Sequence, residues 1–228
     1  MAGGKSQRAH KKRAFEAMTK KGKALEIFKR LSKANPRPKV ELDFTSPFQL
    51  LVATILAAQC TDKLVNTVTP ALFKKFPTIK SLADASVVDI DAMITNVNFH
   101  PNKAKNIHAA SRMIMDTYHG VVPQTMEQLD ALPGVARKTA NVVLGSGFGI
   151  ASGIVVDTHG IRLSNRLGLT TQKDPVKIEQ DLMKLIPQDK WIDFGHLLTL
   201  HGRYVCTARP HTCDDCPLGD LCPEYTAI

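Results

Sequence analysis

The sequence lacks any apolar run long enough for a membrane span. Its longest uncharged stretch, residues 142–156, has fifteen residues with four glycines and two serines. A membrane helix needs about 20 predominantly apolar residues. The first residues carry charge with no apolar segment behind them, so we expect no secretory signal. These two absences predict no membrane association and a cytoplasmic location.

No segment alternates apolar and polar residues for long enough to predict a β-sheet. Apolar residues instead recur at helical spacing, and the composition of 43% apolar and 22% charged residues is ordinary for a folded protein. Ser46 and Pro47 suit the N-cap and first position of a helix that is apolar almost all round and so deeply buried. The sequence therefore predicts an all-α protein of about ten short helices. They cover residues 24–31, 47–57, 62–76, 87–97, 102–119, 126–132, 137–145, 158–167, 175–186 and 191–201.

Acidic residues are scarce at the N-terminus. Residues 1–33 hold eleven Lys or Arg and two Glu, whereas residues 34–228 hold nineteen basic and nineteen acidic residues, so the net charge of +9 belongs to the N-terminal part. We interpret residues 1–23 as a basic arm that is mobile or loosely helical. Such an arm suits a polyanion, because each phosphate contact releases a counterion. A solvated tail without a binding function explains the charge equally well.

Cysteine is nearly absent before the last part of the chain. Cys60 stands alone, and the other four, Cys206, Cys213, Cys216 and Cys222, follow a C-x6-C-x2-C-x5-C spacing. This clustering favours a metal site over a disulfide framework or unliganded core cysteines. Four thiolates can hold zinc or an iron–sulfur cluster, and the uneven spacing favours the cluster because structural zinc usually takes two close pairs. The loop has few apolar residues, so we expect its fold to depend on the metal.

A Pro-Gly turn joins two predicted helices within residues 132–140. Gly134 allows a close backbone approach that a side chain would prevent. The helix that follows, from Arg137, offers its first N–H groups and its positive dipole end to a ligand. On this pattern alone the turn is a candidate phosphate site, although Pro-Gly turns without a ligand are common between helices.

Three separated motifs together resemble one known family. They are residues 132–141 (LPGVARKTAN), residues 156–159 (VDTH) and residues 200–204 (LHGRY), the last leading into the four cysteines. In this order they resemble the endonuclease III family, the helix-hairpin-helix group of base-excision DNA repair glycosylases. The resemblance extends from about residue 24 to residue 222. It implies that the four cysteines hold a [4Fe–4S] cluster.

The resemblance implies a two-domain helix-hairpin-helix glycosylase fold with a DNA-binding cleft between the domains. Residues 40–151 would form a six-helix barrel that carries the hairpin at 132–140. Residues 24–39 and 152–228 would form the second domain, with the cluster loop at 206–222. The basic arm, residues 1–23, lies outside the resemblance.

Lys138 and Asp157 match the catalytic lysine and aspartate of the family. A lysine attacks only as the neutral amine, and partial desolvation beside Arg137 would favour that form. The resemblance implies attack on C1′ of a damaged nucleotide, a Schiff base, and β-elimination of the 3′ phosphate. Asp157 follows the buried run 153–156, so it could accept the lysine's proton and stabilise charge on the sugar. It also suits the N-cap of the helix that begins at Thr158.

The implied substrate is double-stranded DNA with oxidised pyrimidines or abasic sites, bound by a monomer in the bacterial cytoplasm at the nucleoid. A base must leave the duplex to be reached, and the gap it leaves must be filled. Gln59 matches the family's plug and Phe99 its wedge, although Asn98 replaces a common glycine before the wedge and His100-Pro101 follows it. The remaining residues expected to contact DNA are Gly134, Val135, Ala136, Arg137 and His159.

Two other functions compete with this bifunctional glycosylase and lyase. A monofunctional glycosylase of the same fold, such as the adenine glycosylase branch, lacks the hairpin lysine and carries an extra C-terminal domain. Lys138 and the end of the chain six residues after Cys222 argue against it. A non-catalytic DNA-binding or electron-transfer protein would explain the cysteines, but it would leave Lys138 and Asp157 without a role.

Overall fold

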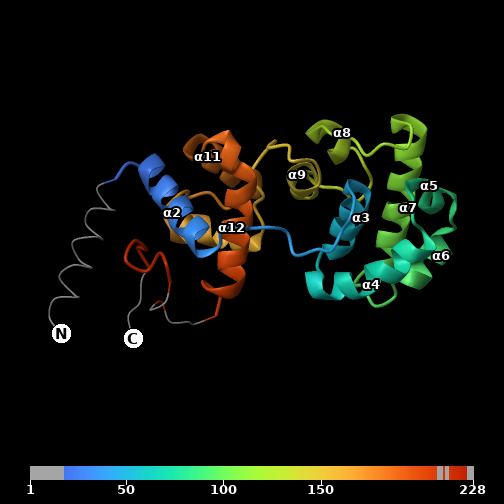
Figure 1. Ribbon diagram of the computed structural model, residues 1–228, viewed down its shortest axis with the longest axis horizontal. Coiled ribbons are helices and arrows are strands. Elements are labelled where there is room, and N and C mark those ends of the chain that lie inside the picture. Colours follow the sequence, from blue (N-terminus) through green and yellow to red (C-terminus); the bar gives the residue numbers. More distant parts are fainter. Residues whose placement is uncertain (1–17, 210–212, 214–215, 225–228) are drawn as a thin grey trace. The chain divides into compact units, whose positions relative to one another are not determined.

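The computed structural model describes residues 18–209, 213 and 216–224. The chain divides into two compact units (Figure 1): a central unit, Val40–Ser152, and a terminal unit of the residues up to Lys39 together with those from Gly153 onward. The second boundary lies one residue after the predicted one. Residues 1–17 of the predicted basic arm lie outside the described residues. Helix α2 (Lys20–Ala34) begins within the last residues of the predicted arm, with the Thr19 side chain as its N-cap.

Helix α3 (Pro47–Ala57) is the core element of the central unit. Ser46 caps it by accepting a hydrogen bond from Gln49 N, Pro47 occupies its first turn, and every residue from Phe48 to Leu56 except Gln49 is buried, which confirms the predicted buried helix. It packs against α4 (Asp62–Lys75), α7 (His100–Tyr118), α9 (Arg137–Val142) and the π-helical segment η1 (Val143–Gly147). The remaining helices of this unit are α5 (Ile79–Asp84), α6 (Val87–Met93) and α8 (Met126–Asp130).

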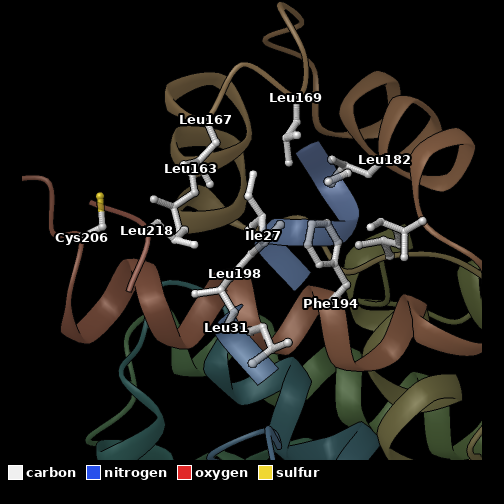
Figure 2. Packing of buried hydrophobic residues seen from close by; sticks show 14 of the residues in the cluster. Ile27, Leu31, Leu163, Leu167, Leu169, Leu182, Phe194, Leu198, Cys206 and Leu218 are labelled. Atoms are coloured by element: carbon white, nitrogen blue, oxygen red, sulfur yellow. The ribbon is translucent and has the colours of Figure 1, made fainter. Parts of the chain in front are cut away.

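The terminal unit packs α2 against α11 (Pro175–Leu185) and α12 (Trp191–Tyr204), and α10 (Thr158–Arg166) against α11 and α12. A short 3-10 turn, η2 (Gln188–Lys190), precedes α12. Phe194 of α12 and Ile27 of α2 are fully buried at the centre of the core (Figure 2). The same core includes Leu218, so the cysteine loop rests on the helices.

The part of the chain that the structure describes contains no strand, which confirms the all-α prediction. No helix among these residues is both long and apolar enough to cross a membrane. Two predicted bounds were wrong at the sites of interest. Helix α7 begins at His100 rather than Asn102, and the predicted helix 137–145 is α-helical only to Val142 before it widens into η1.

Candidate functional site

The Pro-Gly hairpin between α8 and α9 is held by close packing. Leu132 and Val135 are buried on either side of the turn. Gly134 has a φ of +77°, and a Cβ atom added there would lie 2.8 Å from Asn106 Cβ on α7. Both the left-handed backbone and the lack of space therefore require glycine, which fixes the loop that precedes Lys138.

Replacing Gly134 with alanine is expected to lower the free energy of unfolding by about 2 kcal/mol, through backbone strain and the clash with Asn106. Urea denaturation measures this change. Gly149→Ala is the matched control in the same unit, since Gly149 also has a positive φ, +71°, but a Cβ there would meet nothing within 4 Å. It should cost only about 1 kcal/mol. Equal losses for both variants would show that the Asn106 contact does not constrain the hairpin.

Helix α9 presents its first turn directly after this hairpin. Its N-cap is Ala136, which makes no side-chain capping bond. Arg137 is half-buried and Lys138 is exposed. The expected desolvation of the Lys138 amine is therefore not provided by the folded chain, because α9 projects this side chain into solvent.

Asp157 stands at the N-terminus of α10, and Gly160 N donates to its Oδ1 at 2.8 Å. The predicted N-cap is thus confirmed. The preceding residues Ile154–Val156 are buried. A Cβ added at Gly195 of α12 would lie 3.0 Å from Val155 N, so the two backbones are in close contact. The half-buried carboxylate is therefore held on a rigid support.

His159 is half-buried in the first turn of α10, and a Cβ atom added at Gly202 of α12 would lie 2.7 Å from the Cβ of His159. Arg162 lies on the same side of α10, and its Nη2 donates to Gly202 O and Cys206 O, each at 2.7 Å. Arg162 therefore joins α10 to the end of α12 and the start of the cysteine loop. The sequence pattern gave no indication of this contact.

Gln59 and Phe99 occupy two exposed turns of the central unit. Both have a left-handed backbone, with φ of +56° and +57°, and 59% of the Phe99 surface is exposed. The Asn98 side chain donates from Nδ2 to Gln59 O at 2.9 Å, so a hydrogen bond joins the two turns. The structure thus brings together the two residues that the sequence named as plug and wedge.

The four cysteines share one neighbourhood in the terminal unit. Cys206 and Cys222 are buried, and Cys213 and Cys216 are half-buried. Burial raises the pKa of the Cys216 thiol to about 11, and negative charge on the other three cysteines adds to the rise. The described residues contain no set of three or more His, Cys, Asp or Glu side chains placed to hold a single metal ion.

Cationic side chains anchor this loop to the helices. Arg166 Nη1 lies 3.0 Å from Cys206 Sγ, a contact that raises the pKa of the guanidinium, and its Nε pairs with Glu224 at 2.9 Å. Arg30 of α2 pairs with Asp220 at 2.5 Å.

The loop has few apolar residues, as its sequence indicates, but two of them pack into the helical core: Leu218 and Leu221 are 1% and 4% exposed. The structure thus places the expected site residues in three groups. The hairpin with Lys138, and the turns of Gln59 and Phe99, belong to the central unit. Asp157, His159 and the cysteines belong to the terminal unit.

Comparison with known proteins identifies the family to which the chain is similar. Residues 52–188 match the family described as HhH-GPD superfamily base excision DNA repair protein. The endonuclease III of Synechocystis sp. is 53% identical over 209 residues, which cover 92% of this chain and 95% of the relative. The endonuclease III of Escherichia coli (strain K12) is 42% identical over 205 residues, 90% of this chain and 96% of the relative.

A solved structure agrees with these relatives. A trapped endonuclease III–DNA covalent intermediate, an estranged-adenine complex, superposes with a TM-score of 0.86 at 40% identity, covering 91% of this chain and 98% of that one. This chain belongs to the endonuclease III family.

Proposed function

We propose that this protein removes oxidised pyrimidines from duplex DNA as an N-glycosylase and then cleaves the abasic site by β-elimination. The observation that carries the proposal is the exposed Lys138 in the first turn of α9, directly after the Gly134 hairpin, in a chain of the endonuclease III family. An amine in this position can form a covalent bond with the sugar, which a monofunctional glycosylase cannot do.

The Lys138 amine would attack C1′ of the damaged nucleotide as the glycosidic bond breaks and the base leaves with a proton. Opening of the sugar ring then gives an iminium between Nζ and C1′, a Schiff base. The iminium withdraws electrons, so a proton leaves C2′ and the bond from C3′ to the phosphate oxygen breaks. Because Lys138 is exposed in the free chain, bound DNA would exclude water from its amine.

Asp157 would act on the same reaction through its carboxylate. One oxygen, Oδ1, is held by Gly160 N, and no other partner of this carboxylate occurs among the described residues. The second oxygen could accept the proton that Lys138 loses and stabilise positive charge that develops on the sugar. Residues 154–156 would hold the Asp157 carboxylate in place before the reaction, so that no free energy is spent on reorienting it in the transition state.

The remaining expected residues would bind and open the duplex. The hairpin backbone at Gly134, Val135 and Ala136, together with Arg137, would hold a phosphate at the start of α9. Gln59 would fill the space of the extruded nucleotide and Phe99 would wedge the opposite strand. His159 would contact DNA beside Asp157.

We propose that the four cysteines hold a [4Fe–4S] cluster. The donor set fits: the four thiols lie close enough for their charges to interact, and burial raises the pKa of Cys216 and Cys222, so a cation is needed to stabilise these two thiolates. Each iron of such a cluster would take one cysteine thiolate, so the four cysteine sulfurs need not surround a single metal ion. The cluster would supply a covalent crosslink between α12 and the loop that packs on α2.

The purified protein is expected to be yellow-brown, with broad absorption near ~400 nm and about four irons per chain. Cys213→Ser should lose this absorption and lower the melting temperature, while Leu218, Leu221 and the Arg30–Asp220 pair keep part of the loop in place. Cys60→Ser is the matched control, because Cys60 belongs to the other unit, and it should retain the full iron content. Stoichiometric zinc in place of iron after anaerobic purification would contradict the assignment.

A gel assay on duplexes with one oxidised pyrimidine tests the proposed function. The wild-type protein should release the base and cleave the strand without added alkali, leaving an unsaturated aldehyde on the 3′ end. Release of the base with strand cleavage only after alkali treatment would instead indicate a monofunctional glycosylase.

A further inference from the structure

The turn that carries Gln59 is fixed from inside the protein by a buried lysine. Lys103 of α7 is only 5% exposed. Its Nζ donates to Leu56 O at 2.7 Å, to Ala58 O at 2.6 Å and to Cys60 Sγ at 3.4 Å. The ammonium therefore occupies the C-terminal end of α3, where unpaired carbonyl groups and the negative end of the helix dipole favour a cation.

These contacts involve the residues immediately before and after Gln59. Lys103 holds the carbonyl before it and the thiol after it, and Asn98 Nδ2 holds the carbonyl of Gln59 itself at 2.9 Å. The side chain of Gln59 is exposed and makes no hydrogen bond within the part of the chain that the structure describes. The backbone around Gln59 is thus held by three hydrogen bonds, while the Gln59 residue itself is exposed.

Phe99 directly follows Asn98 and is the N-cap of α7, where Asn102 N and Lys103 N donate to its carbonyl oxygen at 3.1 Å each. His100 Nδ1 lies 2.6 Å from Asp91 Oδ1 of α6, which holds the far side of this turn. A left-handed backbone at a phenylalanine or a glutamine costs free energy and persists only where the surroundings enforce it. Two such residues in turns bonded to each other indicate a preformed arrangement rather than two independent loops.

We propose that Lys103 and Asn98 are positioning residues that hold Gln59 and Phe99 as one preformed wedge for insertion into the duplex. The inference rests on the proposed function for the roles of Gln59 and Phe99. Insertion into the duplex must offset the free energy of unstacking a base pair. A turn that was flexible before insertion would also lose conformational entropy, so a preformed turn makes insertion more favourable. Asn98, which departs from the glycine common in the family, supplies a bond that glycine cannot form.

Asn98→Ala tests this with little risk to folding, because Asn98 is exposed. The rate of single-turnover base excision should fall about fivefold when the damaged base is paired, as for the loss of one neutral hydrogen bond. It should stay near the wild-type rate when the damaged base faces a gap in the opposite strand, since no intact pair must then be separated. Asn102→Ala, an exposed asparagine in the first turn of α7, is the matched control and should excise from both duplexes at wild-type rates.

Lys103→Met should produce the same pattern with a larger loss, about tenfold or more, because charged hydrogen bonds are lost. Lys105→Met is its control, since Lys105 is an exposed lysine of the same helix. If Lys103→Met does not fold, as thermal melting would show, Asn98→Ala alone decides. Wild-type excision from the paired duplex by Asn98→Ala, or equal losses on both duplexes, would overturn the proposal.

A second measurement separates this inference from the proposed function. Fluorescence of 2-aminopurine placed opposite a non-cleavable abasic analogue reports the insertion of Gln59 and Phe99 without any catalysis. The wild-type protein should raise it, and Asn98→Ala should reduce the amplitude or rate of that rise. A wild-type protein that gives the fluorescence change but no excision would refute the proposed function and leave the wedge intact. Indistinguishable traces for wild type and Asn98→Ala would refute the wedge.

Discussion

Strand cleavage at an abasic site is expected to fall roughly a thousandfold or more in Lys138→Gln, because the amide cannot form a Schiff base. Affinity for the same DNA should change by less than about tenfold, since the Gly134 hairpin does not depend on this exposed side chain. Single-turnover cleavage and a binding titration on one abasic duplex give the two numbers. A large loss of cleavage rate with little loss of affinity distinguishes a nucleophile from a lysine that only contacts phosphate.

Lys177→Gln is the matched control for charge, because Lys177 is an exposed lysine on α11. It removes one positive charge and should leave the cleavage rate within about twofold of wild type. The role of Lys138 as nucleophile would be wrong if Lys138→Gln cleaved as fast as this control. A large and equal loss of affinity and cleavage would indicate a phosphate contact instead.

Glycosylase turnover is expected to fall about a hundredfold in Asp157→Asn, because the amide keeps the shape and loses the base and the charge. The amide oxygen can still accept the bond from Gly160 N, and asparagine is as good an N-cap as aspartate. The melting temperature should therefore change little. Asp157→Ala should lose the cap as well, at a cost of about 1 kcal/mol in unfolding free energy.

Asp174→Asn is the control for this variant. Asp174 caps α11 in the same way, accepting from Lys177 N at 2.9 Å, and it lies outside the proposed site. Its substitution should leave glycosylase turnover unchanged. If Asp157→Asn turned over as fast as Asp174→Asn, Asp157 would be a helix cap and nothing more.

Most helices could be predicted because their apolar residues repeat over three or more turns. Ser46 and Pro47 marked the start of α3 correctly, since capping acts locally. Helix α5 was not predicted, because only two of its six residues, Leu82 and Ala83, are buried, and they are adjacent rather than at helical spacing. The start of α7 was placed too late because Pro101 suggests a break, yet proline is allowed in a first helical turn. The η1 segment packs on α3, where Gly147 lies against Pro47 and Leu50, and such contacts between distant segments leave no local pattern in the sequence.

The site divides in the same way into local and tertiary features. The Gly134 turn and the Asp157 cap could be predicted, because both depend on a few consecutive residues. The exposure of Lys138 could not, since the sequence does not show what covers a helix terminus. Lys103 and Cys60 are 43 residues apart, so no local pattern indicated their contact. Asn98 was visible only as a departure from the family, and its bond to Gln59 explains what that departure does.

Borohydride trapping tests the central claim most directly. Wild-type protein, incubated with a duplex that contains one abasic site and then reduced, should form a covalent protein–DNA adduct, because borohydride reduces the iminium to a stable amine. After digestion with protease and nuclease, mass spectrometry should locate the remaining sugar on Lys138, and Lys138→Gln should give no adduct. An adduct on another residue, or none with active wild-type protein, would contradict the assignment of Lys138 as the nucleophile.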